Sequence, residues 1–220
     1  GNHPELPVFV GEMPLDVHAP GCYTSQAEMK RYNRRNEQLA DAAERSAVIA
    51  DWMGAVPYPK EALNDAWKRF LWHQFHDDLT GTSIWEAYTY SWNDEFLAQG
   101  QFCDVILASA GAAASVMDTR AKGSPVLVYN PAAYSRRSLV EATVDLPAEA
   151  EGVAVYAPDG KTVPAQIVAR DGARATVLFA AAMEPVSYAV YDVRAGKAGK
   201  GKVLRASGNT LENRVYKVTL

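Results

Sequence analysis

Residues 59–84, PKEALNDAWKRFLWHQFHDDLTGTSI, decide what kind of fold this chain forms. Pro59 suits the first position of a helix, where its missing N–H breaks no hydrogen bond. Apolar residues then recur with the spacing of one helical face, namely Leu63, Trp67, Phe70 and Leu71. From His76 to Ser83 the pattern is interrupted by Gly and hydroxyl residues, and Thr82 or Ser83 can cap another helix. The stretch therefore predicts two helices joined by a short polar turn.

A helix is also predicted before this stretch, and the second helix of the stretch is predicted to run on. Thr24 and Ser25 offer a hydroxyl cap, and Gly54 can take the left-handed conformation that ends a helix. Between them, one stripe follows in steps of three and four, formed by the small or apolar residues Met29, Tyr32, Leu39, Ala43, Ala50 and Met53 and completed by the polar residues Asn36 and Ser46. Helical spacing continues from Ile84 to about residue 118. Three helices on short connections predict an antiparallel three-helix bundle over residues 24–120.

The rest of the chain has the pattern of an all-β domain. Short apolar segments rich in β-branched residues recur at 126–129, 139–144, 153–156, 166–169, 175–179 and 188–193. Pro158-Asp159-Gly160 and Asp171-Gly172 lie between them as turn signals. We therefore expect a β-sandwich domain over residues 121–220, which is partial because a new strand begins at Tyr216. With a loop-rich lead-in over residues 1–23, the predicted class is α+β multidomain.

Composition and charge exclude several classes of protein. A hydrophobic fraction of 48% is too high for a disordered chain, and 220 residues allow more than one folding unit. The net charge of -4, with acidic and basic residues interleaved, argues against a nucleic-acid partner. No apolar run approaches the roughly 20 residues of a membrane span, so no membrane partner is expected. The absence of an Asn-x-Ser/Thr sequon favours a bacterial source and leaves cytoplasm and periplasm both open.

Two of the four histidines could bind a metal ion. His73 and His76 lie three residues apart at the end of a predicted helix, a spacing that puts both on one face, and Asp77 follows directly. Neutral imidazole beside a carboxylate can ligate a divalent cation. The other interpretation is a helix-terminal histidine favoured by the helix dipole, beside a turn aspartate. Spacing alone favours this second interpretation.

Residues 73–82, HQFHDDLTGT, closely resemble the signature of glycoside hydrolase family 38, the α-mannosidases, whose usual form reads His-His-Asp-Ala-Ile-Thr-Gly-Thr. Two further stretches agree with this resemblance. Residues 21–34 are similar to the beginning of the family's middle helical domain, and residues 128–131, VYNP, resemble the start of its C-terminal β region. The three matches occur in the family's order and together cover essentially the whole chain.

Carried over by position, the resemblance implies a role for two residues. His76 falls on a zinc ligand of the family, and Asp77 falls on an aspartate that contacts mannose hydroxyls. The first histidine of the usual motif is Phe75 here, which removes no ligand from the family pattern. The resemblance gives His73 no role. The turn at Thr80-Gly81-Thr82 is expected to aim the imidazole of His76 out of the bundle.

The resemblance also implies what this chain does not contribute. Family members are retaining glycosidases, with an aspartate nucleophile and an acid/base carboxylate about 5–5.5 Å apart. Those carboxylates and the other zinc ligands belong to the family's N-terminal barrel domain, which ends roughly where this chain begins. We therefore expect part of a zinc-dependent α-mannosidase that acts on mannose-containing oligosaccharides. The chain is expected to hold no catalytic residue and to be inactive without the barrel domain.

Several other side chains are assigned structural or solvent-exposed positions. Five titratable residues are expected to be solvated, although the first two could border a substrate cleft: Glu12, His18, Asp94, Glu95 and Asp104. Three aromatic residues at helical spacing are expected in the bundle core and not on a sugar-stacking surface: Trp85, Tyr88 and Trp92. Cys22 and Cys103 are predicted to be free thiols, with Cys103 buried.

Two other functions remain open at this point. The chain could be a non-catalytic module, a helical bundle with a sandwich, that binds glycans or a protein. It could also be an unrelated metallohydrolase whose site lies wholly within four residues of the turn, His73, His76, Asp77 and Asp78. Stoichiometric zinc in the isolated chain at neutral pH would favour the metallohydrolase.

Overall fold

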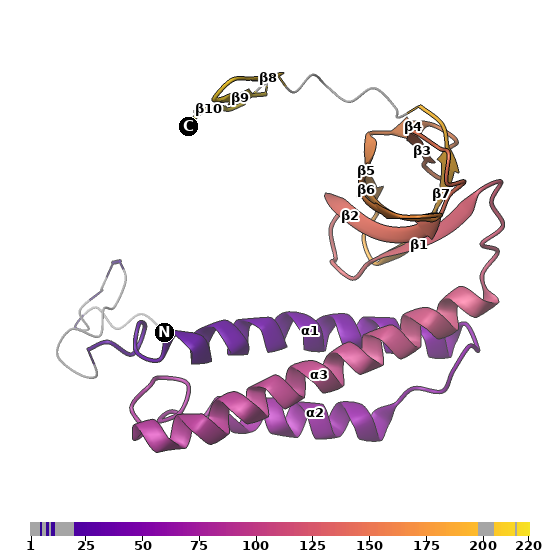
Figure 1. Cartoon of the computed structure of the whole chain (residues 1–220). Helices are drawn as coiled ribbons and strands as arrows, with labels where there is room; N and C mark the ends of the chain where they lie inside the picture. Colours follow the sequence, from indigo (N-terminus) through magenta and orange to yellow (C-terminus); the bar gives the residue numbers. More distant parts are fainter. Residues whose placement is uncertain (1–4, 6–7, 9, 12–19, 198–204, 214) are drawn as a thin grey trace. The chain divides into compact units, whose positions relative to one another are not determined.

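The computed structural model describes residues 5, 8, 10–11, 20–197, 205–213 and 215–220 (Figure 1). The predicted lead-in lies mostly outside these residues, and so do Glu12 and His18. The chain divides into two compact units, residues 1–44 with 59–107 and residues 45–58 with 108–220. In the described residues, no helix combines the length and the apolar character that crossing a membrane requires.

The three predicted helices are present. They are α1 (Ala27–Trp52), α2 (Lys60–Trp72) and α3 (Trp85–Val116). Gly54 follows α1 with a φ of 68°, the left-handed conformation expected of a residue that ends a helix. Pro59 caps α2, and its carbonyl accepts the N–H of Leu63 at 3.0 Å. Gly54 therefore follows α1 as predicted, whereas Pro59 lies one residue before the first position of α2 and not at it.

Side chains from α1, α2 and α3 pack together within the first unit. The rings of Trp67 and Phe70 on α2 lie 5.7 Å and 6.4 Å from the ring of Phe102 on α3. The indole N–H of Trp67 donates a hydrogen bond to Glu44 on α1 at 2.9 Å. The largest fully buried side chains of this unit include Met29, Leu63, Phe70, Tyr88, Glu95 and Phe102. These contacts confirm the helical bundle.

Two of the three aromatic residues expected in this core lie outside it. Tyr88 is buried, but Trp85 is 72% exposed and Trp92 is 40% exposed. The buried stripe of α3 follows Tyr88 in steps of three and four residues through Ser91, Glu95, Ala98 and Phe102. Trp85 and Trp92 are seven residues apart on a neighbouring stripe. The spacing of the aromatic residues thus predicted the helix correctly, but it did not predict which face of α3 is buried.

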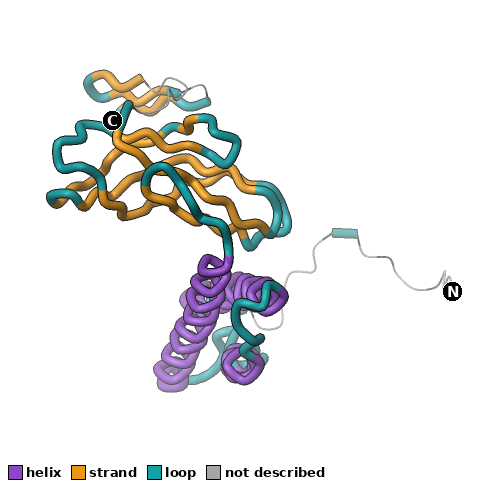
Figure 2. The backbone as a smooth tube through the Cα atoms, turned by 90° about the vertical axis from the view of Figure 1, so that its right-hand side faces the viewer, coloured by secondary structure: helices purple, strands orange, loops and turns teal. Residues whose placement is uncertain are grey.

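The second unit contains an antiparallel β-sandwich, which confirms the expected fold class. One sheet has the order β1-β7-β3-β4 and the other has the order β2-β6-β5. Their bounds are β1 (Ser124–Asn130), β2 (Arg136–Asp145), β3 (Val153–Tyr156), β4 (Thr162–Val163), β5 (Ala165–Asp171), β6 (Arg174–Met183) and β7 (Ser187–Ala195). Figure 2 shows the strands grouped together instead of alternating with the helices.

The inner faces of the two sheets share one apolar core. Val155 on β3 and Val193 on β7 belong to the same buried cluster as Val177 and Phe179 on β6. A third, small sheet follows, formed by β8 (Arg205–Ser207), β9 (Thr210–Glu212) and β10 (Lys217–Thr219). The strand expected from Tyr216 is β10. Strands of two or three residues such as β4, β8 and β9 are too short to show an alternating pattern, so the sequence did not predict them.

Candidate functional site

The two histidines of the turn between α2 and α3 point to different environments. Because α2 ends at Trp72, His73 occupies its C-cap and is 4% exposed, whereas the side chain of His76 is 76% exposed. The prediction that both lie on one helical face is therefore wrong. Because α2 ends before His76, the spacing of three residues does not place the two side chains on the same face of a helix.

The backbone of the turn is fixed by hydroxyl groups that converge on Asp77. Its carbonyl oxygen accepts hydrogen bonds from the Ser83 N–H at 2.9 Å, the Ser83 hydroxyl at 2.8 Å and the Tyr88 hydroxyl at 3.2 Å. The Thr80 hydroxyl donates to the carbonyl of His76. Several donors on a single peptide group hold that part of the chain in one conformation.

The imidazole of His76 lies beside the carboxylate of Asp77. Oδ2 of Asp77 is 3.2 Å from Nε2 of His76, and Oδ1 accepts a hydrogen bond from the Thr82 hydroxyl at 3.0 Å. The ring of Phe75 lies 4.1 Å from the imidazole ring, centroid to centroid. Within the described part of the chain, Nδ1 of His76 has no hydrogen-bond partner. The turn therefore presents one imidazole nitrogen and one carboxylate to solvent.

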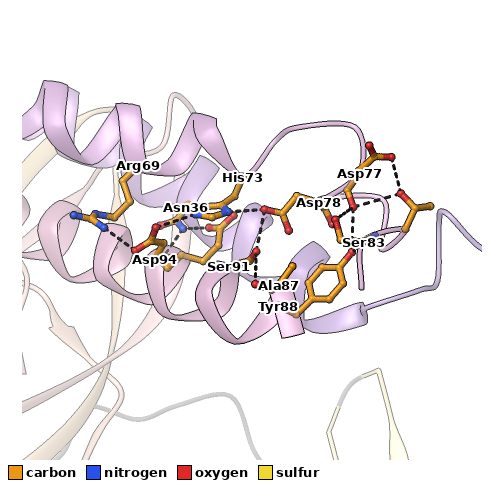
Figure 3. Close-up of polar contacts among 12 residues, drawn as sticks. Asn36, Arg69, His73, Asp77, Asp78, Ser83, Ala87, Tyr88, Ser91 and Asp94 are labelled. Atoms are coloured by element: carbon orange, nitrogen blue, oxygen red, sulfur yellow. Dashed lines mark hydrogen bonds and ion pairs between the residues drawn. The ribbon is translucent and has the colours of Figure 1, made fainter. Parts of the chain in front are cut away.

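Behind the turn, His73 is part of a chain of charged side chains that Figure 3 shows in sticks. Its Nδ1 lies 2.6 Å from Oδ2 of Asp78, and its Nε2 lies 3.2 Å from Oδ2 of Asp94. Arg69 donates to Oδ1 of Asp94 at 2.7 Å, and Ser91 donates to Oδ2 of Asp78 at 3.0 Å. Asp94 is therefore not the solvated residue that the sequence predicted. It is paired with Arg69 on α2 and with His73 at the C-cap of that helix.

Glu95 is the largest correction to the predicted surface. Its side chain is fully buried, and Oε2 accepts a hydrogen bond from the amide of Asn36 on α1, whereas Oε1 is buried without a partner. Burial raises the pKa of this carboxyl from 4.5 to about 7, against the opposing effects of the Asn36 hydrogen bond and of the charge of His73. Asp104, in contrast, is exposed as expected, and Cys103 is half-buried.

The described residues do not bring together a complete set of metal ligands. In the described residues there is no group of three or more His, Cys, Asp or Glu side chains that could hold a metal ion together. His73 turns toward Asp78 and Asp94 while His76 turns to solvent, so the geometry does not favour a complete metal site within the turn. An exposed imidazole next to a carboxylate is, however, a suitable donor for a zinc ion shared with other ligands.

A pocket of about 550 Å³ lies against the same turn. It is lined by Trp72, His73, Phe75, Asp78, Ser83, Ala87, Tyr90, Ser91 and Asp94. The lining includes the interacting side chains of His73, Asp78 and Asp94. It also includes three exposed aromatic side chains, Trp72, Phe75 and Tyr90. Phe75 belongs both to this pocket and to the contact with His76.

Replacing Gly81 with alanine is expected to destabilise the first unit by about 1–3 kcal/mol. Gly81 has a φ of 85°, and an added Cβ would lie 2.6 Å from Cβ and 2.9 Å from the carbonyl oxygen of Ser25. Both the backbone strain and the collision oppose alanine here. Thermal unfolding measures the effect, and Gly100→Ala within α3 is the control, because a Cβ there meets nothing within 4 Å. Equal melting temperatures for Gly81→Ala and the unaltered chain would contradict this account of the turn.

Comparison with known families identifies the helical part of the chain. The model of the α-mannosidase middle domain matches residues 18–110. An α-mannosidase of Saccharomyces cerevisiae is 37% identical over 91 residues, which are 39% of this chain and 8% of that protein. α-Mannosidase 2C1 of Mus musculus is 37% identical over 81 residues, which are 36% of this chain and 8% of that protein. The matched region thus spans less than a tenth of these relatives.

Solved structures extend the likeness to the sandwich. An α-mannosidase from Enterococcus faecalis V583 superposes with a TM-score of 0.71 at 21% identity, over 91% of this chain and 27% of that one. A protein of glycosyl hydrolase family 38 from Enterococcus faecalis superposes with the same TM-score and identity, over 92% of this chain and 29% of that one. At this identity the superpositions show a shared fold, in which the bundle is followed by the β domain.

Proposed function

Because the chain belongs to the α-mannosidases of glycoside hydrolase family 38 through its middle domain, residues 18–110, we propose that it is part of a longer zinc-dependent enzyme. That enzyme hydrolyses terminal α-mannosides with retention of configuration, and mannose-containing oligosaccharides are its substrates. His76 supplies one zinc ligand and Asp77 contacts mannose hydroxyls. A barrel domain of the same protein supplies the other ligands, the nucleophile and the acid/base carboxylate.

The exposure of His76 at the α2–α3 turn is the observation that carries this proposal. A ligand that completes a zinc site with groups from another domain must project from its own domain, and the side chain of His76 is 76% exposed. A closed site needs three or four protein ligands, more than the described residues bring together. The geometry therefore suits a shared site better than a site within this chain.

The residues of this chain have separate tasks in the proposed reaction. Zinc, when bound, acts as a Lewis acid toward sugar hydroxyls. His76 presents a neutral imidazole nitrogen to it. Asp77 keeps free acceptor sites, since a carboxylate has about four and contacts to His76 and Thr82 occupy two. Those sites can accept hydrogen bonds from sugar hydroxyls and thereby orient the ring.

The role of Asp77 is tested by Asp77→Asn in the full-length protein. KM for an aryl α-mannoside is expected to rise about 10- to 100-fold, because a hydrogen bond to a charged acceptor contributes about 1.5–3 kcal/mol. Bound zinc is expected to stay stoichiometric. Asp65→Asn is the matched control, an exposed carboxylate on α2. An unchanged KM for Asp77→Asn would remove the sugar contact from the proposal.

Calorimetry with the isolated chain separates the proposal from a non-catalytic binding module. Without the barrel domain, the 220 residues are expected to show no turnover and no measurable affinity for mannose oligosaccharides. Tight saccharide binding by the chain alone would favour the module, and the aromatic side chains of the pocket at Trp72, Phe75 and Tyr90 would then be the place to look.

A further inference from the structure

We infer that Tyr88 and Asp78 are positioning residues that fix the direction of the His76–Asp77 pair. The inference rests on the proposed function, because it concerns how a zinc ligand and a sugar contact are held. Neither residue has a role in the motif resemblance, and Tyr88 was expected only to fill the core. Tyr88 contacts the backbone of the turn, and the side chain of Asp78 contacts His73 and Ser91. Within the described part of the chain, neither forms a hydrogen bond or ion pair with the side chain of His76 or Asp77, so both are positioning residues and not catalytic residues.

The hydroxyl of Tyr88 reaches the backbone of the turn at three places. It lies 3.2 Å from the carbonyl oxygen of Asp77, 3.2 Å from that of Asp78 and 3.2 Å from the N–H of Ser83. Its single proton is shared between the two carbonyls, and its oxygen accepts from Ser83. Because the ring is 1% exposed within the bundle, the hydroxyl has a fixed position from which it holds two successive peptide groups.

Asp78 holds the same segment through its side chain. Its Oδ2 receives hydrogen bonds from His73 at 2.6 Å and from Ser91 at 3.0 Å, so the cap of α2 and the body of α3 both hold it. His73 is in turn held by Asp94, and Asp94 by Arg69. The usual family motif has alanine where this chain has Asp78, so this second support is a feature that the motif does not supply.

The two supports meet on either side of one peptide bond. The carbonyl of Asp77 is bound by Tyr88, and the side chain of the next residue is bound by His73 and Ser91. The direction of the His76 and Asp77 side chains depends on this backbone. Since groups that hold a metal ligand in place typically contribute about 10- to 100-fold in metal affinity or activity, a loosened turn is expected to weaken the site while the ligands themselves remain.

Tyr88→Phe in the full-length zinc enzyme tests the inference, because it removes the hydroxyl and keeps the ring in the core. The zinc dissociation constant, measured by competition with a chelator, is expected to rise about 10- to 100-fold. kcat/KM is expected to fall by a similar factor, and the visible spectrum of the cobalt-substituted enzyme is expected to change. Tyr134→Phe, which removes an exposed hydroxyl in the second unit, is expected to change none of these.

Ser91→Ala provides a second and milder variant. It removes one hydrogen bond to Asp78 from α3, and zinc affinity is expected to fall about 2- to 10-fold. If Tyr88→Phe and Ser91→Ala both keep zinc affinity, kcat/KM and the cobalt spectrum while His76→Ala loses its zinc, the positioning role is overturned and the proposed function stands. If His76→Ala itself retains zinc and turnover, both are overturned.

Discussion

His76→Ala in the full-length protein is expected to lose its zinc and to lower turnover of an aryl α-mannoside by at least about 10³-fold. A catalytic zinc ion held by three or four protein ligands is weakly retained when one ligand is removed. The fold is expected to stay intact, since the side chain of His76 is largely exposed and exposed substitutions seldom change stability by more than about 0.5 kcal/mol. Elemental analysis after dialysis and a steady-state assay measure the two effects.

Two controls make the result specific to the imidazole. Lys68→Ala changes an exposed side chain on α2 and is expected to leave zinc content and activity unaltered. Free imidazole added to His76→Ala together with zinc is expected to restore part of the activity, because it can occupy the vacated coordination position. Full activity of His76→Ala without added imidazole would falsify the assignment of the ligand.

Glu95→Gln is expected to reduce the loss of stability that accompanies a rise in pH from 5 to 8. The pKa of Glu95 in the folded chain is about 7, above its ordinary value of 4.5. Between those two values the folded chain holds the proton and the unfolded chain releases it, so stability from this group is lost as the pH rises through this window. A difference of this size corresponds to a loss of about 3 kcal/mol by pH 8. Glutamine does not titrate, so Glu95→Gln has no corresponding loss of unfolding free energy over this pH range.

Urea unfolding at pH 5 and pH 8 measures the effect of Glu95→Gln. The fall in unfolding free energy between the two pH values is expected to be smaller in Glu95→Gln than in the unaltered chain, by about 2–3 kcal/mol. Asp104→Asn is the matched control, because it removes an exposed carboxylate from the same helix and is expected to leave the pH dependence unchanged. The charges of His73 and Asp78 act on Glu95, and both residues are present in every variant compared. Identical slopes for Glu95→Gln and the unaltered chain would rule out a raised pKa.

The pH-dependent contribution of Glu95 to stability is coupled to the candidate site, because the residues whose charges act on Glu95 lie in the turn that carries His76. Glu95 lies near His73 and Asp78 of the connection that presents His76, and the charges of both residues act on it. His73 in turn contacts Asp78 and Asp94. Buried ionisable groups seldom add net stability, because removing a charge from water costs more than most partners return. The network is better explained as a means of fixing the position of the turn, at some cost in stability at alkaline pH.

The sequence by itself determined the elements of this protein and the residues that its candidate site presents. Pro59 and Gly54 lie at helix ends because their backbone preferences depend on immediate neighbours. Alternating apolar residues gave the longer strands for the same reason. The motif around His76 and Asp77 was equally readable, since it is one continuous segment. Thr82 and Ser83, the hydroxyl residues expected to cap α3, donate hydrogen bonds to Asp77 instead.

Only the tertiary structure decided which side chains face inward and which polar groups meet. Glu95 is buried because α1 lies over it and supplies Asn36, which is 59 positions away in the chain. His73 is buried with both ring nitrogens within hydrogen-bonding distance of carboxylates, Nδ1 of Asp78 and Nε2 of Asp94. The order of strands in the two sheets depends likewise on pairing between distant segments, such as β1 with β7. Local periodicity fixes the type of an element, whereas burial and pairing depend on neighbours that are distant in sequence, and those become visible only when the chain is folded.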